Sequence, residues 1–142
     1  MRQALLFLLV LPLAGCFADT NSASDRLGDA VYGLVNAVRW GRADLATELV
    51  DPGFRARFIA AHAAWGDRIT VADCDVETME IARNERRASA IVAVSWYGPD
   101  SELHLTRVAQ EWKAVDRAYM LTRETVLSGD DSLLARAETA AH

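Results

Sequence analysis

The hydrophobic periodicity of this chain changes near Gly66-Asp67, and that change restricts the fold more than any other feature. Before it, large apolar residues recur every three or four positions, which is typical of helices that bury one face. After it, apolar and polar residues alternate as in strands, and the connections between strands are too short for parallel crossovers. The pattern predicts an α+β domain in which N-terminal helices pack on an antiparallel, mainly four-stranded sheet.

Three helices are predicted before the change. The first has an apolar face, an N-cap at Ser24 or Asp25 and a stop at Gly41; the face consists of Leu27, Ala30, Val31, Leu34, Val35 and Val38. A second helix within 42–50 must end near Asp51, because the residue before Pro52 is pushed out of the helical region. A third is expected from about Pro52 to Trp65.

Four strands are predicted after the change. The first starts near Arg68, and its apolar residues do not keep one phase, which indicates a bulge. The second, Arg87 to Tyr97, alternates throughout and is expected at the centre of the sheet. The third covers Glu102 to Lys113. The fourth covers Tyr119 to Val126, where the polar run Thr122-Arg123-Glu124 indicates a half-solvated edge strand.

The N-terminus carries an export signal. Arg2 is followed by an apolar block too short to span a bilayer, and the block ends at Leu13-Ala14-Gly15-Cys16. This ending resembles the lipobox of bacterial lipoproteins, which implies cleavage between Gly15 and Cys16 and a covalent lipid on Cys16. The alternative is an ordinary signal peptide in which Cys16 is incidental. Phe17 stands where the sorting pattern of Gram-negative lipoproteins has Asp for inner-membrane retention, so the resemblance favours the periplasmic side of the outer membrane.

Length and charge limit the remaining choices. A chain of 142 residues has room for one ordinary domain, and 15 basic against 20 acidic residues, a net charge of −5, argue against nucleic acid as a partner. We expect a signal peptide over 1–15, a lipidated cysteine and flexible tether over 16–24, a folded domain over 25–127 and a tail over 128–142 that forms at most a short frayed helix. With Cys16 lipidated, Cys74 has no disulfide partner; the competing account is a Cys16–Cys74 disulfide.

The order of elements, with the stretch Ala37 to Ala46 leading into Leu49-Val50-Asp51-Pro52, resembles the nuclear transport factor 2-like superfamily, whose cone-shaped fold is shared with ketosteroid isomerases. The resemblance covers roughly Asp25 to Val126. It implies a curved sheet wrapped around the helices, with an apolar cavity that some members use for binding or catalysis and others fill with side chains.

No catalytic motif is present. Weak candidates for acid-base chemistry are Asp73, Tyr97 and His104, with Asp75 and His62 as further polar groups near the expected cavity. The His and Cys residues lack metal-ligand spacing, so no metal site and no cofactor other than the lipid on Cys16 are expected.

Large aromatic residues are the candidates for a pocket lining or an interface: Trp65, Trp96, Tyr97 and Trp112. Ile91, Tyr97 and Trp112 could share the outer sheet face, where an apolar patch would favour a homodimer or an envelope protein as partner. We therefore expect a membrane-tethered, non-enzymatic binding or interaction module in the bacterial cell envelope. The alternative is a binding protein or ketosteroid-isomerase-like enzyme that takes a small apolar molecule into a pocket of the cone.

Overall fold

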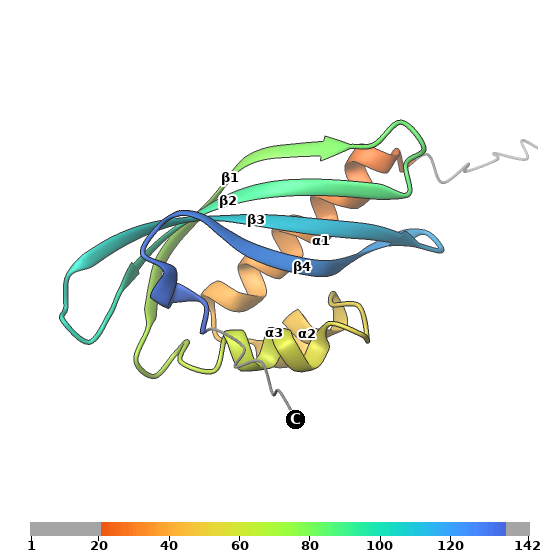
Figure 1. The fold of residues 1–142 in the computed structure, drawn as a ribbon. Coiled ribbons are helices and arrows are strands. Elements are labelled where there is room, and N and C mark those ends of the chain that lie inside the picture. Colours follow the sequence, from red (N-terminus) through yellow and green to blue (C-terminus); the bar gives the residue numbers. More distant parts are fainter. Residues whose placement is uncertain (1–20, 136–142) are drawn as a thin grey trace, which may run out of the picture.

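The structure is a computed structural model that describes residues 21–135 (Figure 1). The predicted signal peptide, the lipobox and the end of the predicted tail lie outside these residues. One long helix, α1, crosses one face of a four-stranded sheet, and two short helices, α2 and α3, follow it. We call the face that α1 covers the inner face and the opposite one the outer face.

Helix α1 (Ala23–Arg39) begins earlier than predicted. Ser22 is the N-cap: its hydroxyl accepts from the Asp25 backbone N–H, and the Asp25 carboxylate accepts from the Ser22 N–H. This reciprocal capping box places Asp25 in the first turn, so the predicted cap at Ser24 or Asp25 is wrong by two or three residues. The predicted apolar face is buried at Leu27, Ala30, Val31, Leu34 and Val35. Gly41, at φ 68°, follows the helix as expected of a stop.

Helices α2 (Ala43–Glu48) and α3 (Arg55–Ala61) are short. The predicted third helix over Pro52 to Trp65 is therefore too long at both ends. At its start, the Asp51 carboxylate accepts from the Gly53 N–H and holds residues 52–54 in a turn. At its end, Trp65 leaves the helix and forms an isolated bridge with Ile69.

The sheet contains β1 (Thr70–Ile81), β2 (Arg87–Tyr97), β3 (Leu103–Val115) and β4 (Ala118–Gly129), paired antiparallel in the order of the sequence. The predicted antiparallel four-stranded sheet is confirmed, with β2 inside it. The expected irregularity in β1 is present twice, between Val71 and Asp73 and between Val76 and Thr78. Such bulges bend a strand, as the curved sheet in Figure 1 requires.

The core lies between α1 and the inner face of the sheet. Along β2 every second side chain is buried there, and Trp112 and Tyr119 from β3 and β4 complete the layer with about 1% of their surfaces exposed. Backbone hydrogen bonds between Leu121 and both Leu49 and Asp51 tie the segment after α2 to β4. A short 3-10 turn after β4, η1 (Asp131–Leu133), adds the fully buried side chain of Leu133.

Two orientations differ from the sequence-based expectation. Trp112 lies on the inner face and is 1% exposed, so it does not belong to the outer face with Ile91 and Tyr97. It alternates in phase with Val108, and the large ring fills the core. Glu124 is not at a solvated edge: its side chain is 7% exposed, because the inner face of β4 is covered at this point by α3 and His62.

Candidate functional site

The outer face of the sheet carries exposed apolar side chains near the β2–β3 turn. Tyr97 and Leu103 lie directly opposite each other on neighbouring strands, and Leu105 lies opposite Ser95. Their exposed fractions are 42%, 61% and 59%. Ile91, half-buried, extends the same face along β2. We call Ile91, Tyr97, Leu103 and Leu105 the outer apolar patch. Adjacent exposed apolar residues of this kind mark interaction surfaces more often than isolated ones do.

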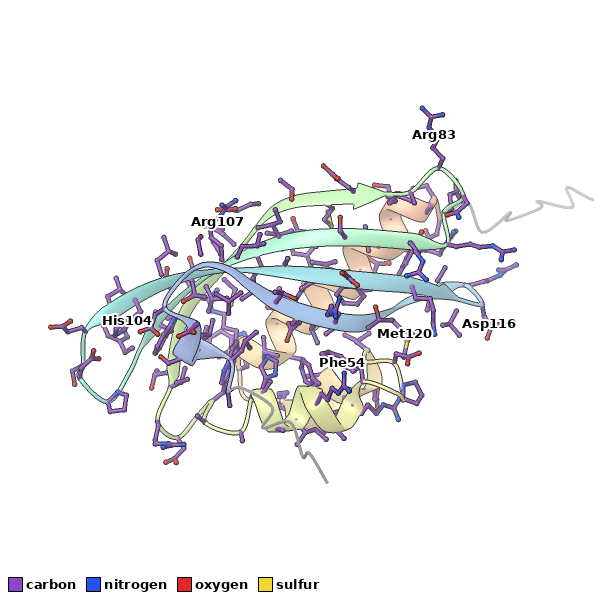
Figure 2. All side chains as sticks on the ribbon, in the orientation of Figure 1. Phe54, Arg83, His104, Arg107, Asp116 and Met120 are labelled. Atoms are coloured by element: carbon purple, nitrogen blue, oxygen red, sulfur yellow. The ribbon has the colours of Figure 1, made fainter. Side chains whose placement is uncertain are left out.

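His104 lies on the opposite face from this patch, at the same end of the sheet (Figure 2). Its Nε2 is 2.9 Å from Oδ2 of Asp100, and its Nδ1 is 3.2 Å from Oδ2 of Asp130. The ring stacks on Trp96 with centroids 4.4 Å apart. The Nε2 contact with Asp100 has hydrogen-bond geometry, and the Asp130 carboxylate lies within ion-pair distance of Nδ1. Through these contacts His104 holds the β2–β3 turn against the end of β4.

The two carboxylates of this cluster are held by further hydrogen bonds. The Glu102 backbone N–H, and then His104, keep the pKa of Asp100 below its ordinary value. The Ser132 hydroxyl and N–H do the same for the pKa of Asp130. Beside them lies a surface cleft of about 260 Å³, which Arg68 and Ile69 also line. Since each polar group of the cluster has a partner within it, the arrangement is suited to holding the turn.

His62 belongs to a second, buried cluster that the sequence did not indicate. Its Nδ1 is 2.8 Å from the Phe58 carbonyl oxygen, and its Nε2 is 3.3 Å from Oε2 of Glu124. The other Glu124 oxygen accepts from the Gln110 amide at 3.1 Å. These contacts join the end of α3 to β3 and β4 through side chains that are far apart in the sequence.

The buried cluster leaves polar atoms unsatisfied. Gln110 Oε1, Trp112 Nε1 and Glu124 Oε2 are buried and have no hydrogen-bond partner among the described residues. The Glu124 contact with His62 is close, but it lacks hydrogen-bond geometry. Gln110 alternates in phase with the buried residues Val108 and Trp112, and this phase is the one sequence signal that could have revealed it. Nothing in the sequence pairs Gln110 with Glu124 or His62.

The three weak acid-base candidates do not converge. Asp73 lies opposite Ser95 on β1 and forms an ion pair with Arg39 at 3.0 Å. Tyr97 belongs to the outer apolar patch, and His104 lies on the inner face. Asp75, opposite Ala93, is exposed like Asp73, so the first bulge does not separate these two carboxylates.

Cys74, between those two aspartates, is half-buried and free. Burial raises the pKa of its thiol to about 11, although the nearby Arg39 guanidinium opposes the shift. A thiol with a raised pKa is a poor nucleophile because little thiolate forms near neutral pH. This position is therefore suited to packing.

A small hollow of about 80 Å³ lies among the helices beside His62 and Trp65, bounded by the end of α1 and the start of α2. Trp65 donates from Nε1 to the Leu133 carbonyl at 2.8 Å, and Trp96 donates to the Thr106 hydroxyl at 3.1 Å. The hollow beside His62 and Trp65 is smaller than the roughly 300 to 1,000 Å³ that is usual for sites of small organic ligands. On the inner face Trp96 and Trp112, two of the predicted aromatic residues, are buried in the core.

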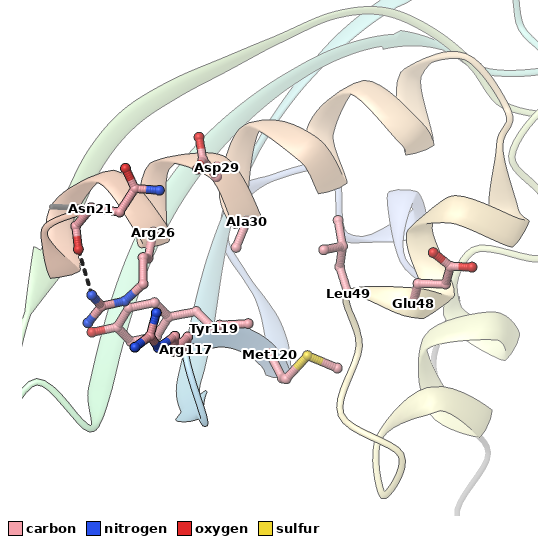
Figure 3. A pocket seen from close by; sticks show the side chains of 10 residues that line it. Asn21, Arg26, Asp29, Ala30, Glu48, Leu49, Arg117, Tyr119 and Met120 are labelled. Carbon is pink, nitrogen blue, oxygen red and sulfur yellow. Dashed lines mark hydrogen bonds between the residues drawn. The ribbon is translucent and has the colours of Figure 1, made fainter. Parts of the chain in front are cut away.

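A surface groove of about 630 Å³ lies between α1 and β4 (Figure 3). It runs between the start of α1 and the start of β4, where Arg26, Arg117 and Tyr119 lie close together. Arg26 donates to the Asn21 carbonyl at 2.7 Å. Asp29 and Glu48 also line the groove, so its charge is mixed.

Within residues 21–135, no cluster of three or more His, Cys, Asp or Glu side chains could hold a metal ion. No helix in this range has the length and apolarity needed to cross a membrane.

No protein-family model and no curated protein matches the sequence. Solved structures do resemble the fold. A protein from Exiguobacterium sibiricum described as a calcium/calmodulin-dependent kinase II association domain gives a TM-score of 0.58 at 14% identity, over 75% of this chain and 92% of that one. A SEC-C motif-containing protein from Rhodopseudomonas palustris gives 0.57 at 11%, over 75% and 93%.

A third similar structure, described as a polyketide cyclase from Silicibacter, gives a TM-score of 0.51 at 13% identity, over 75% of this chain and 90% of that one. At such identities the likeness concerns the fold alone. The helices packed on a curved four-stranded antiparallel sheet, together with these neighbours, show that the chain has the nuclear transport factor 2-like fold.

Proposed function

We propose that this protein is a lipid-anchored, non-enzymatic interaction module of the bacterial cell envelope, and that the outer apolar patch is its interface. One observation carries the proposal: aromatic side chains fill the inner face of the sheet, while the outer face of the same strands exposes Tyr97, Leu103 and Leu105. Apolar surface that the fold leaves uncovered is stabilised when a partner covers it.

A second copy of the chain is the first partner to test. The patch lies on two neighbouring strands near a sheet end, and a twofold contact would bring each patch onto its equivalent. One structure with the same fold is described as an association domain, which agrees with self-association through this fold. An envelope protein of different sequence is the other partner that the patch could take.

The anchor in this proposal is a lipid on Cys16. Leu13-Ala14-Gly15-Cys16 follows a short apolar block, and the residues that the structure describes begin at Asn21, five positions after Cys16. Several acyl chains would hold the domain stably at the periplasmic side of a membrane, with the outer membrane favoured by Phe17. Replacing Cys16 with Ser should release the protein to the soluble fraction, and a variant that stayed with the membrane would contradict the anchor.

The enzymatic alternative needs a pocket in the cone. The hollow of about 80 Å³ among the helices is small for an organic substrate, and the groove of about 630 Å³ is lined by none of the three candidates. Asp73, Tyr97 and His104 do not face a common space. His104 lies between the Asp100 and Asp130 carboxylates and stacks on Trp96, so its ring is held within the cluster at the β2–β3 turn. These arrangements favour interaction over catalysis.

The test is native mass spectrometry of the lipoprotein purified in detergent from its host. We expect a dimer for the wild type and a monomer for Leu103→Asp/Leu105→Asp, because charged side chains oppose burial of the patch. Leu45→Asp is the matched control: Leu45 is 44% exposed in the first turn of α2, away from the outer face. A monomeric wild type would contradict self-association, and a retained small molecule would support the pocket alternative.

A further inference from the structure

Three segments meet at one end of the molecule, which we call the tether end. They are the segment from Asn21 into the start of α1, the β1–β2 hairpin over 82–86 and the β3–β4 turn at Asp116 and Arg117 (Figures 1 and 2). The Tyr119 hydroxyl donates to the Glu85 carbonyl at 2.7 Å, which joins the two hairpins. Asn21 and Arg117 line the same groove, which places the start of α1 beside them.

The β1–β2 hairpin concentrates positive charge at this end. Between Ala82 and Arg87 there are three arginines and one acidic residue, in a chain whose net charge is −5. Arg83, Arg86 and Arg87 are exposed, and none of them forms an ion pair with another residue of the described part. Figure 2 shows the Arg83 side chain directed away from the hairpin. Elsewhere Arg39 and Arg107, for example, are paired with carboxylates.

Cross-strand pairing adds to this concentration. Arg87 lies directly opposite Lys113 in the β2–β3 register. Like charges at opposed positions destabilise a sheet unless an anion neutralises them. Asp51 neutralises Lys113, at 3.0 Å, but forms no ion pair with Arg87 among the described residues. The guanidinium of Arg87 therefore remains available to an external anion.

The opposite end of the sheet is acidic. Its β2–β3 turn and η1 together carry Asp100, Glu102, Asp130 and Asp131, and the nearby loop before β1 adds Asp67. The outer apolar patch lies at this end too, because Tyr97 and Leu103 flank the β2–β3 turn. The domain thus has a basic hairpin at one end, where Asp25 and Asp116 also lie, and an acidic turn with the outer apolar patch at the other.

We propose that the β1–β2 hairpin docks on the anionic headgroups of the membrane in which the protein is anchored; this inference rests on the proposed lipid at Cys16. Four residues lie between Cys16 and Asn21, and the five steps from one Cα atom to the next span at most about 17 Å, so the tether end stays near the bilayer. Arginines within about 8 Å of an anionic surface are attracted to it at physiological ionic strength. The anionic headgroups also repel the acidic end of the domain. The outer apolar patch is therefore directed away from the bilayer, toward a partner.

The experiment measures contact between the hairpin and the bilayer. The lipoprotein carrying Asn84→Cys and Cys74→Ala, which has one labelling site when Cys16 is lipidated, is reconstituted into vesicles of phosphatidylethanolamine and phosphatidylglycerol. A fluorophore at position 84 is then quenched by nitroxide headgroup lipids. We expect strong quenching that is lost in phosphatidylcholine vesicles and at high salt. A fluorophore placed by Glu102→Cys at the acidic end should stay unquenched.

Arginine-to-glutamine variants test whether the quenching depends on the charge of the hairpin, and circular dichroism checks that the fold is kept. Arg83→Gln/Arg86→Gln/Arg87→Gln should reduce quenching at position 84 to the level at position 102, with an unchanged circular dichroism spectrum. The matched control, Arg57→Gln/Arg68→Gln, removes exposed arginines outside the tether end and should leave quenching unchanged. Equal quenching in neutral and anionic vesicles, or in the triple variant, would overturn the docking proposal. Failure of the protein to float with either kind of vesicle would instead contradict the lipid anchor.

Discussion

The two faces of the sheet are made by the same strands, yet one face is buried against the helices and the other is exposed to solvent. On the inner face, Trp96 and Trp112 are buried against the helices, and His62, Gln110 and Glu124 form a polar cluster beneath α3. On the outer face, side chains one position away in the sequence meet solvent and include Tyr97 and Leu103. The inner residues are held by many neighbours, so their replacement should cost stability. The outer residues should affect association and leave the fold intact.

The largest effect is expected at Trp112. Trp112→Ala removes a side chain that is 1% exposed, and the resulting cavity should lower the free energy of unfolding by about 3–5 kcal/mol. Urea denaturation followed by circular dichroism measures this loss. Tyr97→Ala on the outer face is the control and should change stability by less than about 0.5 kcal/mol. Similar losses for both variants would contradict the division between the faces.

The second largest loss of stability is expected at the buried carboxyl group of Glu124. Glu124→Ala removes the partner of Gln110 and His62 and leaves both polar groups buried, which should cost about 1–3 kcal/mol in the same measurement. Glu111→Ala is the comparison on the outer side of β3, where the ion pair with Arg123 spans 3.8 Å and both side chains are exposed. That variant should lose less than about 1 kcal/mol. If Glu111→Ala lowered the free energy of unfolding as much as Glu124→Ala does, the buried cluster would contribute no more to stability than an exposed ion pair.

A smaller effect is expected from acid at the His104 cluster. The pKa of Asp100 and that of Asp130 are lowered in the folded protein, so their contribution is present above the ordinary carboxyl pKa of about 3.9. It is lost as the pH falls through the lowered values. Hydrogen exchange of residues 98–104 should therefore accelerate at strongly acidic pH, beyond the intrinsic pH effect, before global unfolding. In Asp100→Asn that acceleration should be reduced, and an unchanged profile would argue against the contact.

The smallest effect concerns reactivity. With a thiol pKa of about 11, Cys74 should form about a hundredfold less thiolate at pH 8 than a thiol with the ordinary value of 9.0. Alkylation followed by mass spectrometry should show slow labelling of the folded protein and fast labelling in urea. Equal rates would mean that the inner side of β1 is open to solvent.

Much of the fold could be predicted because local patterns carry it. The bounds of β2 match the predicted Arg87–Tyr97, since small or apolar residues occupy every second position from Ala88 to Trp96 without interruption. The bulge in β1 was visible as a loss of phase. The helix ends were less predictable, because Ser22, Ser24 and Asp25 are all competent caps and only the reciprocal Ser22–Asp25 bonds decide among them.

The polar clusters were not predictable, because their members are far apart in the sequence. His62 and Glu124 are brought together when the loop after α2 joins β4 through Leu121, and His104 meets Asp130 only where β4 ends against the β2–β3 turn. Glu124 in particular follows Arg123 in a polar run, and its burial depends on the helix that covers it. Periodicity predicts on which face of the sheet a side chain lies. It does not predict which element packs on that face.

By itself, the sequence determined the secondary structure order, the antiparallel sheet and the acidic charge of the chain, because alternation, helical spacing and turn residues act between near neighbours. Tertiary structure alone decided that Trp96 and Trp112 are buried in the core, that the acid-base candidates lie apart, and that the outer apolar patch and the arginines of the β1–β2 hairpin occupy opposite ends. The physical reason is that burial and proximity depend on long-range packing between elements, which no local pattern encodes.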